Sequence, residues 1–315
     1  MRLRCLTARL QLTTAAQMSL PPFPVFTLRG GFGHAFRKVA CALRRADCTA
    51  CPIIHECVYS YVFETPRPPD AALMRLYPTV PHPFVLAMQP VPQVVPAGYP
   101  LEVSVTLIGR ATRHLNYFIY TFEELGRLGL GRDRVRFNLS DVSVIAADGK
   151  VESAFDPQTG DLYLPDSNLS LDITADIASV RPGRVTIEFV TPTRLKTQGR
   201  IDGNLPFHVL MRNLMRRLRA LATFHEGNPG HEYPAREMIA IAETVADAGT
   251  LRWVPLERFS TRQKRRFSMD GFVGTKTYEG NLGPFLNLLR AGEVVHVGKG
   301  TAFGQGQYRI KELTV

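Results

Sequence analysis

Four of the five cysteines in this chain lie within seventeen residues, at Cys41, Cys48, Cys51 and Cys57. Six, two and five residues separate them, so that Cys48 and Cys51 form a CxxC pair. Four thiolates at such spacings are able to close a tetrahedral metal site, and a site filled entirely by protein ligands is structural. Zinc fits better than an iron–sulfur cluster, because nothing else in the sequence indicates electron transfer. The cysteines therefore predict structural zinc, with His55 able to replace one ligand; four unrelated free thiols are the alternative.

A histidine and a lysine lie one turn apart on a helix that the sequence predicts over residues 31–45. The apolar residues that recur at helical spacing are Phe32, Phe36, Val39, Ala40 and Leu43. At about 100° per residue, His34, Lys38 and Cys41 fall on the opposite face, with Arg37 at its margin. Neighbouring cations disfavour the charged form of a histidine, which leaves a neutral imidazole able to accept a proton. This face predicts a general base with cationic neighbours, and a solvated helix surface is the simpler alternative.

Two basic segments lie in the second half of the chain. A helix predicted over residues 206–227 carries leucines on one side and arginines on the other, and "RQKRR" follows at residues 262–266. The arginines and lysine concerned are Arg212, Arg216, Arg219, with Arg217 flanking, and Arg262, Lys264, Arg265 and Arg266. Interleaved aromatic residues are suited to stacking on bases or to packing in the core. The pattern predicts a track for a nucleic-acid backbone, with a solvated helix face as the alternative.

Near the end of the chain, "HVGKGTAFGQGQYRI" (296–310) contains Gly298, Gly300, Gly304 and Gly306. Glycine-dense loops hold phosphates through main-chain N–H groups. No Ser or Thr directly follows Lys299, and no strand–loop–helix unit surrounds the loop, so it differs from nucleotide-binding loops. The sequence also has no HExxH or GxSxG motif and no convincing carboxylate pair. A metal-dependent nuclease is therefore not expected.

Composition limits the class of partner. The 315 residues include 38 Lys and Arg against 28 Asp and Glu, which gives a net charge of +10 and favours a nucleic acid or another anionic surface as partner. No apolar run approaches the roughly 20 residues of a membrane span, and the N-terminus lacks the apolar core of a signal peptide. We therefore expect a cytoplasmic protein without membrane contact, in which clustered cysteines indicate a metal more than disulfides.

The order of predicted elements indicates an α+β protein. The first half has strands near 2–12 and 101–109, a helix at 113–129, a hairpin turning at Asp148-Gly149, and a Pro-rich stretch at 65–100. The second half repeats this pattern, with a strand at 184–196, the long helix, two strands across a turn near Asp270-Gly271, a helix at 284–292 and a last strand. A helix at 234–250 is extra to the plan. This order predicts two tandem ferredoxin-like (RRM-like, βαββαβ) domains, residues 1–170 and 171–315, with a cysteine-rich metal-binding insertion at 41–57 and the glycine-rich loop at 298–306.

Five blocks, in order, resemble the CRISPR-associated repeat-cleaving endoribonuclease family of the RAMP superfamily. They are "TLRGGFGHAFRKVAC", "DCTACPIIHECVYSYVFET", "LIGRATRHLNYFIYTFEELGRLGLGRDRVRF", "FVTPTRLK" and the glycine segment, and they extend from about residue 27 to residue 310. The resemblance implies two ferredoxin-like domains and metal-independent cleavage of the repeat in precursor crRNA. A ribose 2′-OH attacks its own 3′ phosphate, which leaves a 2′,3′-cyclic phosphate and a 5′-OH. This chemistry uses a base, an acid and cations, and no catalytic metal.

Site residues follow from the same resemblance. His34 matches the position of a catalytic histidine, Lys38 or Arg37 would be the stabilising cation, and Arg29 is a second cation nearby. His296 and Lys299 are reserve candidates, and the glycine loop would hold an RNA backbone. The partners implied are CRISPR repeat RNA or crRNA and other CRISPR effector subunits.

Two other functions are compatible with parts of the sequence. A non-catalytic RAMP subunit that binds crRNA would share the fold, the charge and the glycine loop. His34 beside Lys38, together with two complete units in one chain, favours the enzyme. A zinc-stabilised DNA-binding protein would need a recognition helix, and the sequence shows no motif for one.

Overall fold

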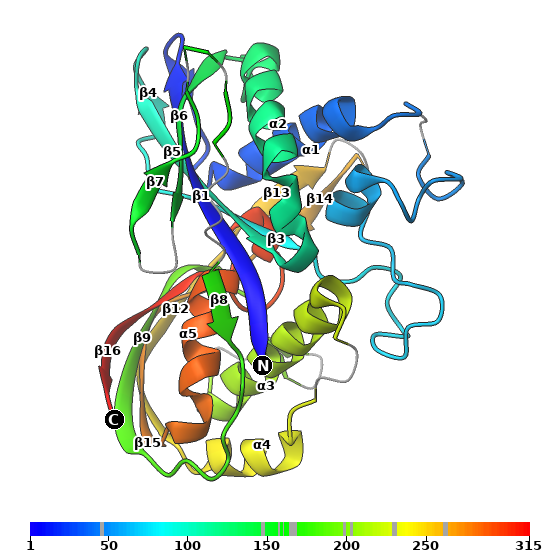
Figure 1. Ribbon diagram of the computed structural model, residues 1–315. Coiled ribbons are helices and arrows are strands. Elements are labelled where there is room, and N and C mark those ends of the chain that lie inside the picture. The colour runs from blue at the N-terminus through cyan, green and yellow to red at the C-terminus, as the bar shows by residue number, and fades with distance from the viewer. Residues whose placement is uncertain are drawn as a thin grey trace. The chain divides into compact units, whose positions relative to one another are not determined.

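The computed structural model describes residues 1–44, 47–145, 149–156, 158–159, 161–163, 169–197, 200–201, 204–228, 232–260 and 264–315 (Figure 1). The chain forms two compact units. We call Arg4–Ser170 the N-terminal unit, and Leu171–Val315 together with Met1–Leu3 the C-terminal unit. All the strand pairs described in their principal sheets are antiparallel, and the fold is of the mixed α and β type.

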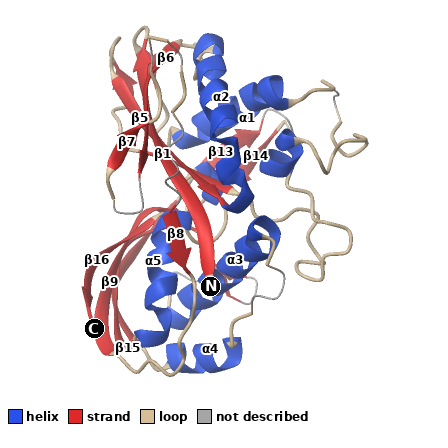
Figure 2. Ribbon diagram, viewed as in Figure 1, coloured by secondary structure: helices blue, strands red, loops and turns tan. Residues whose placement is uncertain are grey.

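The N-terminal unit is built on a six-stranded sheet with the order β3-β5-β1-β6-β7, in which β8 also pairs with β1. Helices α1 and α2 cover one face of this sheet (Figure 2). The elements are β1 (Arg2–Thr14), β2 (Met18–Ser19), α1 (Val25–Ala40), a π-helical turn (Ser60–Glu64), β3 (Phe84–Met88), β4 (Val94–Val95), β5 (Pro100–Ile108), a 3₁₀ turn (Gly109–His114), α2 (Leu115–Leu128), β6 (Phe137–Ile145), β7 (Val151–Ser153) and β8 (Leu169–Asp172).

Burial of aromatic rings between the sheet and its helices explains this arrangement. Phe32 and Phe36 of α1 and Phe118 and Phe122 of α2 are fully buried, as is Phe84 of β3. The ring of Phe32 lies 5.1 Å from that of Phe118 and 5.3 Å from that of Phe122, centroid to centroid. Rings of this size contribute most of the apolar area that holds two helices on a sheet. The aromatic core therefore fixes α1, the helix that carries His34.

The C-terminal unit is built on a four-stranded sheet with the order β12-β15-β9-β16. Helices α3 and α5 lie on one face of it (Figure 2). The elements are β9 (Pro182–Thr193), β10 (Lys196–Thr197), β11 (Arg200–Ile201), α3 (Phe207–Leu221), a π-helical turn (Ala222–Glu226), α4 (Ala235–Glu243), β12 (Ala246–Val254), β13 (Glu257–Ser260), β14 (Arg265–Ser268), β15 (Gly271–Asn281), a 3₁₀ turn (Gly283–Phe285), α5 (Leu286–Val295), a 3₁₀ turn (Thr301–Phe303) and β16 (Tyr308–Thr314).

Both units contain the element order β–α–β–β–α–β, and the strand order is the same in each. In both, the first strand lies between the third and the fourth, and the second strand is outside the third. Four strands of the N-terminal unit, β2, β3, β4 and β8, were not predicted; the longest of them, β3, lies inside the Pro-rich stretch, where the apolar run "FVLAM" is the signal for it. β6 and β7 form the predicted hairpin, whose turn residue Asp148 is outside the described residues.

The helix predicted over residues 31–45 begins six residues earlier, at Val25, directly after Pro24 at the N-cap. It ends at Ala40, so Leu43 is not part of its apolar face and is 44% exposed. Gly31 lies inside the helix, and a Cβ there would come within 2.8 Å of the Leu125 side chain of α2. The glycines therefore permit close packing of α1, and the prediction that the helix starts at Gly31 is wrong.

Two further predictions for the C-terminal unit are corrected. The helix predicted over 234–250 ends at Glu243, because the rest pairs as β12, with Ala246 opposite Glu279. The turn predicted near Asp270-Gly271 is instead the base of an inserted β13–β14 hairpin. There Asp270 accepts hydrogen bonds from the Leu256 N–H at 2.8 Å and from the Ser268 hydroxyl at 2.7 Å. Asp270 thus closes the hairpin rather than turning one long strand into the next.

Candidate nucleic-acid interface

The glycine-rich loop lies between α5 and β16 and is fixed by its own backbone. Five of its N–H groups donate to main-chain carbonyls: Lys299 to Arg194 at 3.2 Å, Phe303 to Gly300 at 2.8 Å, Gly304 to Thr301 at 3.0 Å, Gln305 to Gly300 at 3.2 Å and Gly306 to Pro192 at 3.2 Å. The loop is therefore held against the end of β9. These N–H groups are committed within the protein, so an anion at this loop is to be met mainly by other groups.

Substitution of Gly306 tests how much the stability of the loop depends on glycine. Its φ is +75°, and a Cβ at this position would collide with the Val297 carbonyl. We expect Gly306→Ala to lower the free energy of unfolding by more than the roughly 1 kcal/mol of left-handed strain. Gly227 is the matched control, since it has the same φ of +75° but open space around it. Chemical denaturation of both variants measures the difference; equal losses would show that the contact with Val297 does not matter.

Four cations gather beside this loop. We define the basic cluster as Arg194, Lys196, Arg216 and Lys299. The pKa of Lys299 is lowered mainly by burial, and the charges of Lys196, Arg194 and Arg216 lower it further. Like charges held this close favour an anionic partner, because the partner removes their mutual repulsion. The sequence analysis did not identify Arg194 or Lys196 as site residues. The pattern that could have indicated them is the short basic segment "TRLK" where β9 ends and β10 begins.

Buried polar contacts position the basic cluster. Asn213 of α3 is buried; its amide N–H donates to the Lys196 carbonyl at 3.4 Å, and its oxygen accepts a hydrogen bond from Arg216 at 2.7 Å. Arg194 donates to the carbonyl of Ser268 at the end of β14. The cluster is therefore held by contacts with α3, β9 and β14 together. These contacts restrict the positions of its side chains.

The arginines of α3 divide into two groups. Arg212 and Arg216 are exposed, as the helix pattern predicted, and Arg219 forms an ion pair with Glu232. Arg217 is instead buried, where it donates to the Val295 carbonyl at 2.7 Å and 3.0 Å and to the His296 carbonyl at 3.1 Å. It satisfies carbonyls left without partners at the end of α5. Arg217 thus fixes the backbone at Val295 and His296, directly before the glycine loop.

The β13–β14 hairpin, which we call the arm, is aromatic and basic. The Arg258 guanidinium lies 4.5 Å from the ring centroid of Phe303 in the glycine loop, and Arg265 lies 4.4 Å from that of Phe267. Phe259 is 61% exposed. Cation–π contacts of this kind hold planar groups in place while leaving a face for a base.

Of the basic residues predicted on this segment, Lys264, Arg265 and Arg266 are exposed. Arg266 forms an ion pair with Glu257 at 3.2 Å. Arg262 lies outside the described residues.

His296, a reserve candidate for the base, is only 4% exposed. Its Nδ1 lies 3.2 Å from the Gln305 carbonyl oxygen. Burial lowers the pKa of His296 to about 3, so the imidazole is neutral at physiological pH. A side chain at this depth supports the loop rather than meeting a substrate.

On α1, His34 and Lys38 are both exposed and lie one turn apart. Lys38 donates to the Glu124 carboxylate of α2 at 2.5 Å, which lowers the pKa of Glu124. The Arg37 guanidinium lies 5.6 Å from the ring centroid of Tyr59. The sequence thus placed this face correctly but missed the carboxylate that partners Lys38.

Arg29, predicted as an RNA contact, points into the interior of the N-terminal unit. It is 5% exposed, and its guanidinium lies 3.6 Å from the ring centroid of Phe63. This stacking makes Arg29 part of the packing between α1 and the π-helical turn. Its charge is not presented at the surface where a phosphate would lie.

A second histidine, which the sequence did not single out, has a more structured setting. His114 is half-buried at the start of α2, and its ring lies 6.1 Å from that of Tyr61 and 6.0 Å from that of Tyr117. Burial lowers the pKa of His114, and the charges of Arg113 and Arg110 lower it further. The neutral form of this imidazole is therefore favoured, and it lies among cations and phenol rings, a combination suited to proton transfer near a phosphate.

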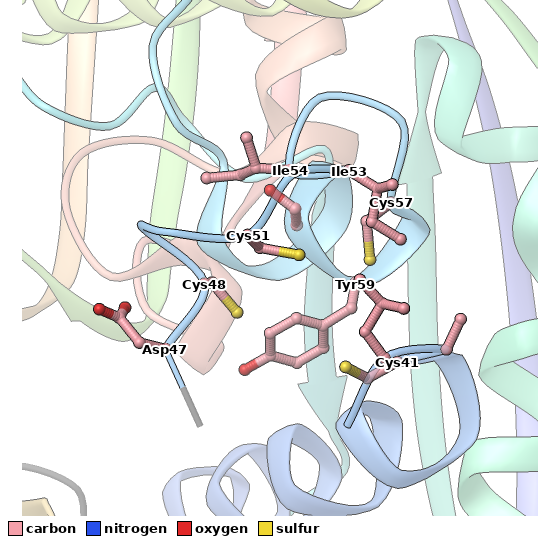
Figure 3. Close-up of a pocket in the computed structure, with 11 residues that line it drawn as sticks. Cys41, Asp47, Cys48, Cys51, Ile53, Ile54, Cys57 and Tyr59 are labelled. Carbon is pink, nitrogen blue, oxygen red and sulfur yellow. The ribbon is translucent and has the colours of Figure 1, made fainter. Parts of the chain in front are cut away.

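Cys41, Cys48, Cys51 and Cys57 line one cavity together with Tyr59. Figure 3 shows their sulfur atoms around a common space. In the part of the chain that the structure describes, no group of three or more His, Cys, Asp or Glu side chains is arranged to hold a metal ion. The four cysteines are thus brought together but not in coordinating geometry.

A cationic cluster beside a glycine loop in an α+β protein is typical of proteins that bind a polyanion such as a nucleic-acid backbone. Two family models match the chain: an N-terminal domain model, AF_1859_N, over residues 3–167, and the model of the CRISPR-associated endoribonuclease Cas6 over residues 187–308. The basic cluster, the arm and the glycine loop all lie inside the second match. Residues 187–308 thus match the Cas6 family, and residues 3–167 match the family of the AF_1859_N domain.

Individual relatives cover nearly the whole chain. A protein of Archaeoglobus fulgidus, described only as uncharacterized, is 27% identical over 304 residues, which are 94% of each chain. A product complex of Thermus thermophilus Cas6 matches with a TM-score of 0.54 and 18% identity, over 98% of this chain and 99% of that one. A chain of a partial Cas6-RT-Cas1–Cas2 complex matches with a TM-score of 0.54 and 12% identity, over 98% of this chain and 46% of that one. At these identities the solved structures establish a shared fold.

No helix among the described residues combines the length and the apolar character that crossing a membrane would need.

Proposed function

We propose that this chain is an endoribonuclease that cleaves CRISPR repeat RNA in precursor crRNA. The observation that carries the proposal is the convergence of the basic cluster and the glycine loop within the residues that match the Cas6 family. We also propose that both units are ferredoxin-like domains, since each has the βαββαβ order and the strand order of that arrangement.

The reaction proposed is attack of a ribose 2′-OH on the adjacent phosphate. The 2′-oxygen forms a bond to phosphorus and the bond from phosphorus to the 5′-oxygen breaks. A base on the protein takes the 2′ proton, and the leaving oxygen receives a proton. The products are a 2′,3′-cyclic phosphate and a 5′-OH, and no metal takes part.

In this proposal His34 is the general base. Its support is exposure on a helix that a rigid aromatic core holds in place, which suits a group that must reach the substrate. Arg37 and Lys38 are the cations that offset charge on the phosphorane. The contact between Lys38 and Glu124 keeps the ammonium at one place on α1, and a phosphate would compete with that carboxylate for it.

His114 is a second candidate for the base. The observation in its favour is that burial and two arginines lower its pKa, whereas the candidate on α1 lies on an open helix face. The two candidates predict different variants to be inactive.

RNA binding is assigned to the C-terminal unit. The basic cluster would meet phosphates, the glycine loop would support it, and the arm would offer Phe259 to a base. The exposed arginines of α3 extend this surface. CRISPR proteins are proposed as further partners, since one matching chain is part of a complex with Cas1 and Cas2.

Incubation with an end-labelled cognate repeat RNA in EDTA tests the proposal. Cleavage that leaves a 2′,3′-cyclic phosphate on the 5′ fragment is expected. Cleavage that requires a divalent ion would overturn the metal-independent reaction. Tight binding without any cleavage would favour the alternative, a non-catalytic RAMP subunit that holds crRNA in an effector complex.

A further inference from the structure

The segment that carries the four cysteines has no apolar core of its own. From Cys41 to Val58, none of the described side chains is buried, and the apolar residues Ile53 and Ile54 are only half-buried. A peptide segment of this length cannot bury enough apolar surface to fix its own conformation, and such segments are usually held by disulfides or a metal. A cross-link among its thiols would therefore stabilise this segment, which no buried apolar side chain holds in the described residues.

The four thiols are placed where such a cross-link would form. Each of the four cysteines is half-buried rather than exposed, and together they line one cavity of about 10 Å³. That volume is roughly one water-sized sphere, so the cavity has room for a single ion. Short turns already bring the thiols to this cavity, with hydrogen bonds from the Cys51 N–H to the Cys48 carbonyl at 3.1 Å and from the Cys57 N–H to the Ile53 carbonyl at 2.9 Å.

We propose that Cys41, Cys48, Cys51 and Cys57 together bind one zinc ion that holds this segment to α1. The sulfur atoms face a common space (Figure 3), and a segment without buried side chains is free to draw them into tetrahedral geometry around the ion. Thiolate ligands select zinc over magnesium or calcium, which prefer oxygen. With all four positions filled by sulfur, the site is structural and leaves no open position for a substrate.

The ion would join two elements that matter for the N-terminal unit. Cys41 directly follows α1, and its N–H donates to the Arg37 carbonyl at 3.0 Å. At the other end, the Cys57 carbonyl accepts from the Tyr61 N–H at 2.9 Å, at the start of the helical segment that carries Tyr59. The metal thus ties the end of α1 to the turn whose rings pack on it.

Metal analysis of the full chain, purified with a thiol-free reductant and without oxygen, tests the proposal. One zinc per chain is expected, and titration with a mercurial reagent should release it as four thiols react. Replacement of zinc by Co²⁺ should give the visible absorption of a tetrahedral thiolate site. Limited proteolysis should cut within residues 41–57 faster after the metal is removed, while circular dichroism of the whole chain changes little.

Cys48→Ser and Cys51→Ser should each lose the metal, whereas Cys5→Ala should keep it, because Cys5 is buried in β1 away from the cavity. The mercurial titration of the unaltered chain does not depend on the folding of these variants. A chain that holds no metal after zinc loading and dialysis would overturn the proposal, as would disulfides among these cysteines under reducing conditions. Neither result bears on whether the chain cleaves RNA.

Discussion

Replacement of His34 by alanine is expected to lower the rate of repeat cleavage in EDTA by roughly 10²–10⁴-fold, the usual contribution of a positioned general base. The reason is that the 2′-OH is a weak nucleophile until its proton is removed, and the α1 face offers no second imidazole. RNA affinity should be unchanged, because His34 is assigned no part in the phosphate-binding surface. Single-turnover cleavage with excess protein separates the chemical step from binding and product release.

Two variants make this result interpretable. His208→Ala is the matched control, because His208 lies on α3 in the C-terminal unit and is assigned no role. His114→Ala tests the competing base. If His114→Ala loses cleavage while His34→Ala keeps it, the base lies at the start of α2 and the assignment on α1 is wrong. Loss in both variants with intact folding would indicate separate roles for base and acid.

The elements of both units were largely readable from the sequence, because strand alternation and helical spacing survive in the burial pattern. β1 shows this well from its middle onward, since Ala8, Leu10 and Leu12 are fully buried and the residues between them are polar and exposed. The failures have physical causes. Gly31 was read as a helix start, although its missing side chain permits contact with Leu125. The β13–β14 arm was missed because residues 251–280 were interpreted as two strands across one turn, whereas β12 pairs with β15 and the arm is inserted between them.

Site residues were harder to predict, because contacts distant in sequence decide them. Spacing placed Arg212 and Arg216 on the exposed face of α3, as the structure shows. Spacing did not reveal that Phe63 covers Arg29, nor that Arg194 and Lys196 join Lys299. Periodicity reports which face of an element is apolar, whereas a cluster of like charges depends on the fold that brings several elements together.

The basic cluster yields the second large effect. The double variant Lys196→Ala with Lys299→Ala is expected to weaken RNA binding roughly 10–100-fold at ~0.1 M salt, since each phosphate contact releases about one counterion. The slope of log affinity against log salt should fall by about two, one for each lysine. Measurement of Kd by filter binding at several salt concentrations gives both quantities.

Lys311→Ala serves as the control, because Lys311 is exposed in the same unit but pairs with Glu188 at 3.3 Å, away from the cluster residues that act on Lys299. Its loss changes net charge by one without removing a proposed phosphate contact, so the salt slope should stay the same. An equal fall in slope for this control would mean that overall charge attracts the RNA. An unchanged slope in the double variant would place the phosphates elsewhere, and the arm with Arg265 and Phe259 would become the next surface to test. The lowered pKa of Lys299 also predicts a proton effect on RNA binding. A bound phosphate should raise that pKa again, so RNA binding should be accompanied by proton uptake at alkaline pH.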